Sequence, residues 1–224
     1  MSVTATKIIA DVDVDLKDVD SSGAAAYQQF LEADLLDYLN AAEGAIVMLK
    51  PDASVTTASS TLAAGTKQSL PTGGILLMDI YRNMGVSPGT TPGTTIVRVD
   101  IKVKNAIDPA WHTATAAAVV QEYMYDSNNP KVFWVSPPQP SSGFGYVEMA
   151  YSKIPTKIAS TATAINLDDI YEEPIRAYMM HRALAKLADQ SPQAAQRSAE
   201  WLNVFLRLMG QKESAKIYYG ADRK

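Results

Sequence analysis

The chain of 224 residues is 47% hydrophobic and carries a formal net charge of −4, from 24 acidic and 20 basic side chains. This much apolar material suffices for one large domain or for a domain with a sizeable insertion. The absence of cysteine excludes disulfides, thiolate metal sites and cysteine nucleophiles, and it fits a protein made in a reducing cytoplasm. The mildly negative charge argues against a protein whose main task is to grip nucleic acid, since phosphate binding depends on clustered lysine and arginine.

The chain contains no run of about 18 apolar residues and no basic start followed by an apolar leader, so we expect neither membrane insertion nor secretion. Its charges are unevenly distributed. Residues 1–50 hold nine acids and three bases, whereas residues 168–224 hold eight acids and nine bases. An acidic beginning and a basic end could attract a neighbouring subunit, although solvated surface charge explains the pattern equally well.

The first fifty residues contain two patterns. Valine and aspartate alternate over residues 11–15, a period of two that predicts either a strand with one face in water or an extended arm. Asp20, Ser21 and Ser22 then offer oxygens that can cap a helix N-terminus. A helix is predicted over roughly residues 24–49, because apolar side chains recur at three- and four-residue steps until Pro51, at Tyr27, Leu31, Leu35, Leu39, Ala42, Ile46 and Leu49. Its other face, expected to face water, carries Gln28, Glu32, Asp37 and Glu43.

From Pro51 to about Pro155 the period changes and turn residues multiply. Strands are predicted over residues 56–63 and 75–83, separated by Gly65 and a turn over residues 71–74. Residues 87–95 contain Pro-Gly-Thr-Thr twice and predict a flexible loop rather than a repeat unit. Residues 96–103 alternate apolar with mainly charged side chains, as a two-faced strand does, and the alanine-rich residues 114–125 fit either a helix or a strand.

A turn signal, two short aromatic strands and a proline pair occupy residues 125–153. Proline fixes its own φ and biases the preceding residue away from helix, so Asn128-Asn129-Pro130 predicts a turn before Val132. A strand then runs to Pro137-Pro138, and a second strand covers residues 146–151 after a Ser/Gly bend. We therefore predict a β-hairpin, whose aromatic side chains pack in a core or in cross-strand pairs.

Two helices are predicted near the C-terminus. Asp169 and Glu172 resemble a capping box for a helix over roughly residues 170–189. Ser191-Pro192 indicates the start of the next helix, as an N-cap serine followed by proline at the first helical position. This second helix should bury an apolar stripe that ends at Gly210 and consists of Trp201, Leu202, Phe205, Leu208 and Met209.

The predicted order is a helix, a β-rich block of about a hundred residues and two helices. Neither end of the chain contributes enough apolar helix surface by itself, so the first helix should pack against the last two. We predict an α+β fold in which residues 1–50 and 156–224 form a helical, bundle-like body and residues 51–155 form an inserted β-rich arm or wing.

A calcium site is the first candidate for chemistry. The aspartates of residues 11–15 place oxygens at the first, third and fifth positions of a calcium loop. Leu16, however, stands where such a loop requires glycine, and Ser22 stands where it requires glutamate. We therefore predict no metal site here.

Catalytic groups are equally sparse. His112 and His181 are the two histidines of the chain, and neither lies near a serine in the context of a nucleophile. The acidic pairs Asp168-Asp169 and Glu172-Glu173 suit the favourable field of a helix N-terminus better than acid–base catalysis. We predict that the protein is not an enzyme and binds no cofactor.

Four segments, in the same order along the chain, resemble head-to-tail adaptor proteins of short-tailed bacteriophages. They are the opening helix with Leu35–Asn40 that closes at Leu49-Lys50-Pro51, residues 65–71 leading into residues 76–85, the hairpin of residues 126–151, and the helix pair from Tyr171. The hairpin matches the family pattern Pro-x-x-Phe-x-Val-x-Pro-Pro followed by Val-Glu-x-x-Tyr-x-x-x-Pro. The acidic Val-Asp start and the Pro-Gly-Thr-Thr loop depart from the family.

The resemblance implies a virion structural protein, made in the cytoplasm of the host bacterium, that forms a ring of twelve copies beneath the portal protein at the neck. Such a ring extends the channel for the genomic DNA, without sequence-specific binding, and offers a platform to tail or nozzle proteins. Rings use heterologous contacts, in which one surface meets a different surface of the next copy. A helical body with a protruding arm suits that requirement.

Two sets of residues are the candidate contacts of this ring. The C-terminal segment is aromatic and basic and lies beyond the last predicted helix, so we expect it to bind the portal through Tyr218, Tyr219, Arg223 and Lys224. The β-rich block is expected to contact adjacent subunits or tail proteins through Phe133, Trp134 and Tyr146.

Two alternatives remain. A stand-alone module that binds protein or carbohydrate through the aromatic hairpin predicts a monomer or small oligomer with an exposed aromatic groove. An enzyme that uses carboxylates without histidine predicts a deep acidic pocket.

Overall fold

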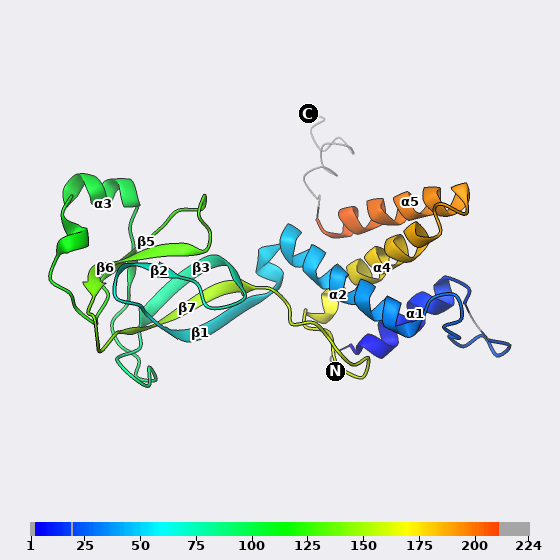
Figure 1. Cartoon of the computed structure of the whole chain (residues 1–224), viewed down its shortest axis with the longest axis horizontal. Coiled ribbons are helices and arrows are strands. Elements are labelled where there is room, and N and C mark those ends of the chain that lie inside the picture. The colour runs from blue at the N-terminus through cyan, green and yellow to red at the C-terminus, as the bar shows by residue number, and fades with distance from the viewer. Residues whose placement is uncertain (1–2, 19, 211–224) are drawn as a thin grey trace, which may run out of the picture. The chain divides into compact units, whose positions relative to one another are not determined.

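The computed structural model describes residues 3–18 and 20–210, and its helices and two sheets confirm the predicted α+β class (Figure 1). The chain divides into two compact units. The helical unit combines the chain up to Ala53 with the chain from Pro155 onwards, and the β unit is Ser54–Ile154. The β unit is therefore an insertion between two parts of the helical unit.

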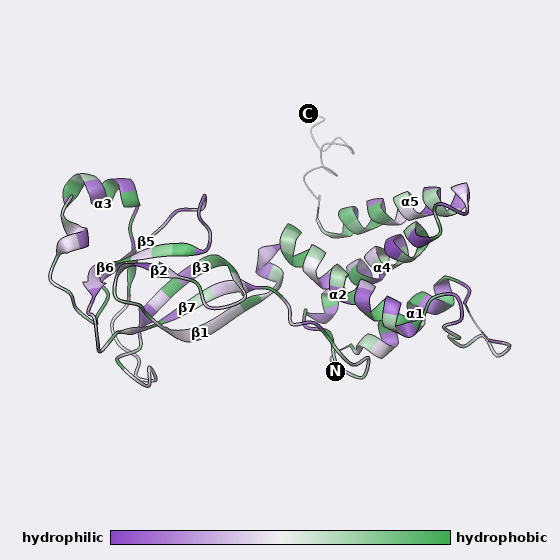
Figure 2. Cartoon of the chain, in the orientation of Figure 1, coloured by the Kyte–Doolittle hydropathy of each residue, from purple (hydrophilic) through white to green (hydrophobic). Residues whose placement is uncertain are grey.

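The helical unit contains α1 (Ala5–Asp15), α2 (Glu32–Leu49), α4 (Glu172–Lys186) and α5 (Pro192–Leu208), with the 3-10 turns η1 (Pro51–Ala53) and η3 (Asp169–Tyr171). Helix α4 packs against α1, α2 and α5. The helices alternate apolar and polar stripes along their lengths, as Figure 2 shows in green and purple. The apolar stripes of α2 and α4 supply fully buried side chains, among them Leu35, Leu39, Ile46, Ile175, Met179 and Met180. Among the described residues, no helix is both long enough and apolar enough to cross a membrane.

The prediction of a strand or extended arm over the Val-Asp repeat is wrong, because these residues belong to α1. Thr4 caps this helix, its Oγ1 accepting the N–H of Lys7 at 3.4 Å. The buried face starts upstream of the repeat and follows helical spacing, at Ala5, Ile8, Ile9, Val12 and Asp13. The alternation covers only five residues, so the helical period of the longer segment prevails.

Helix α2 begins at Glu32, later than the predicted residue 24. Asp20 does not cap it; instead its Oδ1 accepts the N–H groups of Ser22 and Ala24 in a local turn. Tyr27 has a φ of 52°, which is incompatible with a right-handed helix. The residues before Glu32 are therefore held in an irregular loop, although apolar residues within it continue the helical spacing.

The β unit contains two sheets. One has the strand order β1–β7–β3, with β1 at Val55–Thr61, β7 at Tyr146–Lys153 and β3 at Gly74–Asn83. The other has the order β2–β6–β5–β4, with β2 at Gly65–Ser69, β6 at Val132–Gln139, β5 at Glu122–Tyr125 and β4 at Val97–Arg98. All neighbouring strands are antiparallel except β4 and β5. The predicted strands near residues 56–63 and 75–83 correspond to β1 and β3, whereas β2 was not predicted and lies between Gly65 and the turn of residues 71–74.

Both sheets contribute to one apolar core. Alternation along each strand turns one set of side chains inward, as in β6, where Phe133 and Val135 are buried and Trp134 between them is half-buried. The core consists of Leu62, Leu77, Ile80, Ile96, Val120, Tyr123, Phe133, Val135, Val147, Met149 and Tyr151. Of the aromatic side chains in the predicted hairpin, Phe133 and Tyr151 are buried in this core and Tyr125 packs against it, whereas Trp134, Phe144 and Tyr146 are half-buried.

The predicted hairpin of residues 132–138 and 146–151 is wrong. The two strands follow one another in the chain, but β6 and β7 belong to different sheets. Strand β6 continues through the proline pair to Gln139, whose Oε1 accepts the N–H of Gly145 at 2.9 Å and whose Nε2 donates to the carbonyl of Ala117 at 2.9 Å. These bonds hold the chain where it crosses between the sheets. The turn at residues 128–130 instead joins β5 to β6.

Of the strand predicted over residues 96–103, only Val97–Arg98 (β4) is a strand, and the rest of the prediction is wrong. Asp100 caps the helix α3 (Ile101–Ile107), its Oδ1 accepting the N–H groups of Lys102 and Val103 at 2.7 and 3.2 Å. A capping aspartate thus ends the strand within the alternating pattern. A short 3-10 turn η2 (Trp111–Thr113) follows, and β5 is the only strand within residues 114–125.

The C-terminal helix pair differs from prediction in its caps and its burial. Asp168 caps η3, accepting the N–H of Ile170 at 3.0 Å, so Asp169 and Glu172 form no capping box. Ser191 caps α5 as predicted, accepting the N–H of Ala194 at 3.3 Å. The predicted apolar stripe of α5 is only partly buried: Phe205 is buried, but Leu208 is 48% exposed and the remaining three residues are half-buried.

Candidate assembly surfaces

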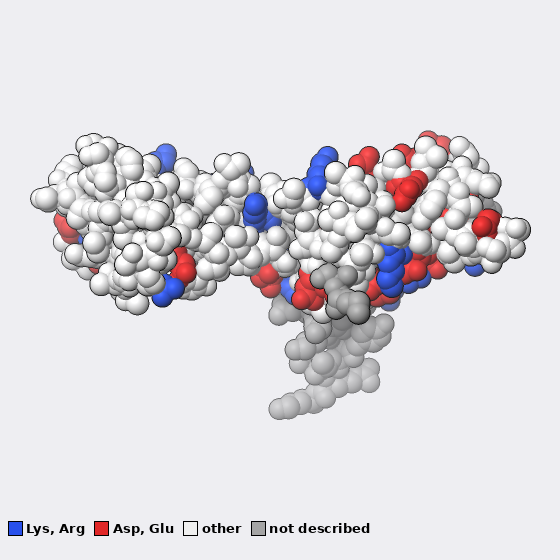
Figure 3. Space-filling model, turned by 90° about the horizontal axis from the view of Figure 1, so that it is seen from below, with Lys and Arg blue, Asp and Glu red and all other residues white. Residues whose placement is uncertain are grey.

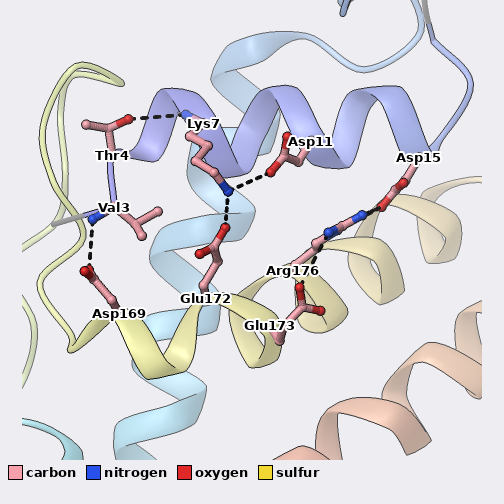
Figure 4. A network of polar contacts seen from close by, with 9 residues as sticks. All are labelled: Val3, Thr4, Lys7, Asp11, Asp15, Asp169, Glu172, Glu173 and Arg176. Carbon is pink, nitrogen blue, oxygen red and sulfur yellow. Dashed lines mark hydrogen bonds and ion pairs between the residues drawn. The ribbon is translucent and has the colours of Figure 1, made fainter. Parts of the chain in front are cut away.

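The N-terminal helix is fastened to α4 by ion pairs (Figure 4). Lys7 binds Asp11 of its own helix at 3.0 Å and also Glu172 of α4. These two carboxylates, Glu172 foremost, raise the pKa of the Lys7 amine. At the other end of α1, the Nε of Arg176 donates to Oδ2 of Asp15 at 2.8 Å. Glu172 at the start of α4 and Arg176 one turn later therefore hold α1.

Backbone contacts extend this attachment to the residues before α1. The N–H of Val3 donates to Oδ1 of Asp169 at 2.9 Å (Figure 4). The carbonyl of Val3 accepts the N–H of Ile165 at 3.0 Å, and the N–H of Ala5 donates to the carbonyl of Thr163 at 2.9 Å. The N-terminal segment is thus bonded along the loop that precedes η3.

Two aspartates hold the loop between α1 and α2. Oδ2 of Asp13 accepts the N–H groups of residues 26 and 27 at 2.9 and 3.1 Å. Oδ2 of Asp18 accepts those of residues 29 and 30 at 2.6 and 3.0 Å. Asp13 is 0% exposed, and its Oδ1 has no hydrogen-bond partner among the described residues. The aspartates therefore bind backbone N–H groups of a loop that lacks the regular hydrogen bonds of a helix or a sheet.

The environments of the two aspartates have opposite effects on their acidity. Burial raises the pKa of Asp13, and the two backbone donors compensate only in part. Burial also acts on Asp18, but the N–H donors of residues 28–30 outweigh it and hold the pKa of this carboxyl below its usual value. Folding thus makes Asp13 a weaker acid and Asp18 a stronger acid than in the unfolded chain.

Two polar residues of α2 bind the chain that returns from the β unit. Oδ1 of Asn40 accepts the N–H of Ile158 at 2.7 Å, and its Nδ2 donates to the carbonyl of the same residue at 3.0 Å. The carboxylate of Glu43 accepts the backbone N–H of Asn166 at 2.7 Å and its side-chain Nδ2–H at 2.7 Å. Glu43 is buried, which raises its pKa. These contacts fix the chain between β7 and α4 within the helical unit.

The predicted interface residues of the β unit do not come together. Phe133 is buried in the core, and Trp134 is half-buried on the opposite face of its sheet. Tyr146 begins β7 in the other sheet. Its ring lies close to Gly89: a Cβ atom added to this glycine would be 2.2 Å from Cδ1 of Tyr146. The interface role stays a prediction, and the burial of Phe133 leaves Trp134 and Tyr146 to make such contacts. The predicted portal-binding residues Tyr218, Tyr219, Arg223 and Lys224 lie outside the described residues.

Several large apolar side chains are exposed at the ends of elements. The most exposed are Met48 near the end of α2, Ile107 at the end of α3 and Ile170 in η3. The helical unit also contains a hollow of about 220 Å³, lined by residues that include Phe30, Leu184 and Arg197. These features offer places for contact but not a catalytic cleft.

The histidines have structural partners. His112 stacks on Trp111 with ring centroids 3.7 Å apart, and its Nδ1 lies 2.9 Å from Oγ1 of Thr66. Nδ1 of His181 lies 2.9 Å from Oγ of Ser198, a distance that would suit a nucleophile and its base. Ser198, however, is 5% exposed and its Oγ also lies 3.0 Å from the carbonyl oxygen of His181, so this pair joins α4 to α5. Within the described residues, no three histidine, aspartate or glutamate side chains are grouped to hold a metal ion.

Charge is concentrated in the helical unit. Ser54–Ile154 contain seven basic and six acidic residues, whereas the remainder of the chain contains thirteen basic and eighteen acidic residues. On the face drawn in Figure 3, the β unit is mostly free of charged side chains, while the helical unit carries both signs. The β unit is therefore nearly neutral, and the acidity of the protein belongs to the helical unit.

Sequence reasoning missed the polar residues that join distant segments. Glu43 was placed on the solvent face of its helix, but it lies four residues after Leu39 and three before Ile46, within the buried stripe. A carboxylate at such a position is a signal for a buried partner. Asp13 likewise falls within the buried stripe of its helix, four residues after Ile9. This spacing indicates burial only once residues 5–15 are known to form a helix.

Comparison with known proteins gives the family. A family model described as SU10 adaptor protein matches residues 3–223, which is nearly the whole chain. A search of curated proteins found no match. The family match confirms the resemblance to phage head-to-tail adaptors, which are structural proteins rather than enzymes. The chain belongs to the SU10 adaptor protein family of bacteriophages.

Proposed function

We propose that the protein forms a ring of twelve copies beneath the portal at the neck of the virion. The ring lengthens the channel through which the genomic DNA passes and gives tail or nozzle proteins a platform. Each copy is synthesised in the cytoplasm of the host bacterium and joins the portal vertex during assembly. The family match over residues 3–223 is the observation that carries this proposal.

Two features of the chain support a ring. Closed rings need two different surfaces on each copy, and the chain provides two units of different composition, one acidic and one nearly neutral. A channel wall should let DNA slide, and an acidic chain avoids the clustered phosphate contacts that would retain it. The alternative of a stand-alone binding module relied on a single aromatic hairpin, whose strands belong to two different sheets.

Native mass spectrometry tests the ring directly. The 24.2 kDa chain is measured alone and after mixing with the portal of the same genome. A gain of about twelve copies, roughly 290 kDa, on the portal is expected. No association at any salt concentration would contradict the proposal and favour the stand-alone module.

The portal contact is assigned to the C-terminal segment with Tyr218, Tyr219, Arg223 and Lys224, because aromatic and basic side chains follow the last predicted helix. A chain truncated after Gly210 should lose portal binding in the same experiment. Binding equal to that of the full chain would remove this assignment without affecting the ring itself.

A further inference from the structure

The hollow of the helical unit lies where four parts of the chain meet. They are the end of α1, the loop before α2, the end of α4 and the start of α5. Five of the nine lining residues are apolar, namely Leu16, Phe30, Leu184, Leu187 and Ala194. The volume of about 220 Å³ is below the roughly 300–1,000 Å³ of small-molecule sites, so the hollow suits a single side chain of a partner protein better than a free ligand.

Hydrogen bonds fix the walls of this hollow. Oδ2 of Asp18 accepts the N–H groups of Gln29 and Phe30 at 2.6 and 3.0 Å, and both of these residues line the hollow. On the opposite wall, Oγ of Ser191 accepts the N–H of Ala194 at 3.3 Å. A site whose walls are held in place before binding loses less conformational entropy when a partner fills it.

Arg197 gives the hollow its charge. It is the one charged residue among the described residues that line the hollow, and its side chain is exposed. It forms no ion pair with another residue of the described chain. A guanidinium beside an apolar hollow favours a partner that presents an apolar side chain with a carboxylate next to it.

Such a side chain lies at the other end of α4. Ile170 in η3 is 73% exposed, and it follows Asp168 and Asp169 in the sequence. Glu172 and Glu173, which come next, have cationic partners within the helical unit. The two aspartates form no ion pair with a described residue, so their charge remains available to a partner.

The other strongly exposed apolar side chains do not have this charge pattern. Met48 is followed by a cation, Lys50. Ile107 is followed by Asp108, but this carboxylate lies 3.8 Å from the amine of Lys104. Ile170 therefore matches the hollow and its arginine better than either of them.

We infer that Ile170 of one copy inserts into the hollow of the next copy and places Asp168 and Asp169 beside Arg197. The inference rests on the proposed ring and specifies one of its contacts. The two surfaces lie at opposite ends of α4, whose 15 residues span about 22 Å, so one copy cannot close the contact on itself (Figure 1). Because the surfaces differ, the contact is heterologous and repeats from copy to copy until the ring closes.

Native mass spectrometry of partly filled portals tests the contact. The portal is mixed with half of the copies that it can bind. A contact between neighbours makes binding cooperative, so the wild type should give complete rings beside empty portals. Ile170→Ser and Arg197→Glu should instead fill the portals copy by copy, because losing one buried apolar side chain or its charge partner weakens the association of neighbours by about ten- to a hundredfold.

Two control variants change exposed residues of the same types elsewhere. Ile107→Ser and Lys157→Glu should both keep the all-or-none filling of the wild type. All-or-none filling by Ile170→Ser, or copy-by-copy filling by the wild type, would overturn the inference and leave the ring intact. Loss of all portal binding in Arg197→Glu would assign the hollow to the portal and would overturn it too. If the wild type did not bind the portal at all, the ring itself would be contradicted.

Cysteine cross-linking tests which surfaces meet, because the natural chain has no cysteine. A disulfide requires Cα atoms within about 7 Å, so a bridge between positions 170 and 193, at opposite ends of α4, must join two copies. Oxidised on the portal, protein with both Ile170→Cys and Gln193→Cys should give a ladder of linked copies. We expect about tenfold more linked product than from Lys157→Cys with Gln193→Cys, since only the first pair is held together. Equal ladders from the two proteins, or as much product from Ile170→Cys alone, would overturn the inference.

Discussion

In the helical unit, α1 and the chain that returns from the β unit are held by charged and polar side chains as well as by buried apolar ones, whereas in the β unit the two sheets meet in one apolar core. Lys7 and Arg176 join α1 to α4, and Glu43 holds the chain that returns from the β unit. In the β unit, side chains from both sheets meet in one cluster. The two units should therefore respond differently to pH, to salt and to the loss of a single side chain.

The two units are suited to different roles. Polar contacts at the edge of a unit can open locally, since each contributes little and water competes for its partners. A shared apolar core opens only as a whole, because its side chains are close-packed against one another. The helical unit is thus suited to adjust its N-terminal segment during assembly, and the β unit is suited to remain rigid.

The largest effect is expected from the core of the β unit. Phe133→Ala removes a fully buried ring and should lower the free energy of unfolding of the β unit by about 3–5 kcal/mol. Tyr81→Ala, which truncates an exposed ring of β3, is the matched control and should have a much smaller effect. Urea unfolding in a Trp201→Phe background follows Trp111 and Trp134, both in the β unit. A loss as large in Tyr81→Ala as in Phe133→Ala would show that the buried ring contributes no more to the β unit than an exposed one.

A smaller loss is expected where α2 binds the returning chain. Asn166→Ala removes one of the two donors to the buried carboxylate of Glu43 and should cost about 1.5–3 kcal/mol. Asn203→Ala on the exposed face of α5 is the control. The measurement is urea unfolding followed through Trp201, the tryptophan of the helical unit. Equal stability of the two variants would show that this polar contact does not stabilise the helical unit.

The two loop-holding aspartates should respond to substitution in opposite directions. Asp18→Asn weakens hydrogen bonds to an ionised carboxylate and should cost about 1 kcal/mol at pH 7. Asp13→Asn removes a buried charge whose Oδ1 is unpaired and should leave stability unchanged or raise it. The measurement is the midpoint temperature of thermal unfolding of each variant at pH 7. A lower midpoint for both variants would mean that burial does not disfavour the charge of Asp13.

The pH dependence of stability separates the same two residues. The pKa of Asp18 is lowered on folding, so its contribution is present above its unfolded pKa and is lost as the pH falls through the lower, folded value. The pKa of Asp13 is raised on folding, so its contribution is present at low pH and is lost as the pH rises through the higher, folded value. Asp18→Asn should therefore flatten the loss of stability on acidification, and Asp13→Asn should steepen it. Identical pH profiles would contradict both assignments.

The smallest effect is expected from the ion pairs of α1. Lys7→Ala should cost less than about 1 kcal/mol at low salt and less still at high salt, because exposed pairs are screened. Lys157→Ala, an exposed lysine of the same unit, is the control. Amide hydrogen exchange of residues 5–15 reports local opening of the helix. If exchange in Lys7→Ala were faster than in the wild type by the same factor at every salt concentration, packing rather than charge would hold α1.

The sequence predicted little of the candidate contact surfaces. Phe133, Trp134 and Tyr146 are neighbours in the predicted hairpin, but the structure separates them because β6 and β7 join different sheets. The position of a strand at the edge of a sheet has no sequence signal of its own, since an edge is defined by the strands that are absent from one side. The residues that hold α1 are charged and exposed or half-buried, and such residues form pairs only when the fold brings them together.

By itself, the sequence determined the features that depend on neighbouring residues. Ser191-Pro192 starts α5, Asn128-Asn129-Pro130 turns the chain, and the apolar spacing of residues 35–49 forms most of α2, because capping, fixed φ and helical period act within a few residues. Only the tertiary structure decided which strands pair, where α2 begins and that the Val-Asp repeat is helical. These outcomes depend on burial against distant segments and on carboxylates such as Asp13 and Asp18 that bind the backbone of another part of the chain. Local patterns do not contain that information, because the energy of such contacts arises only when the partners meet.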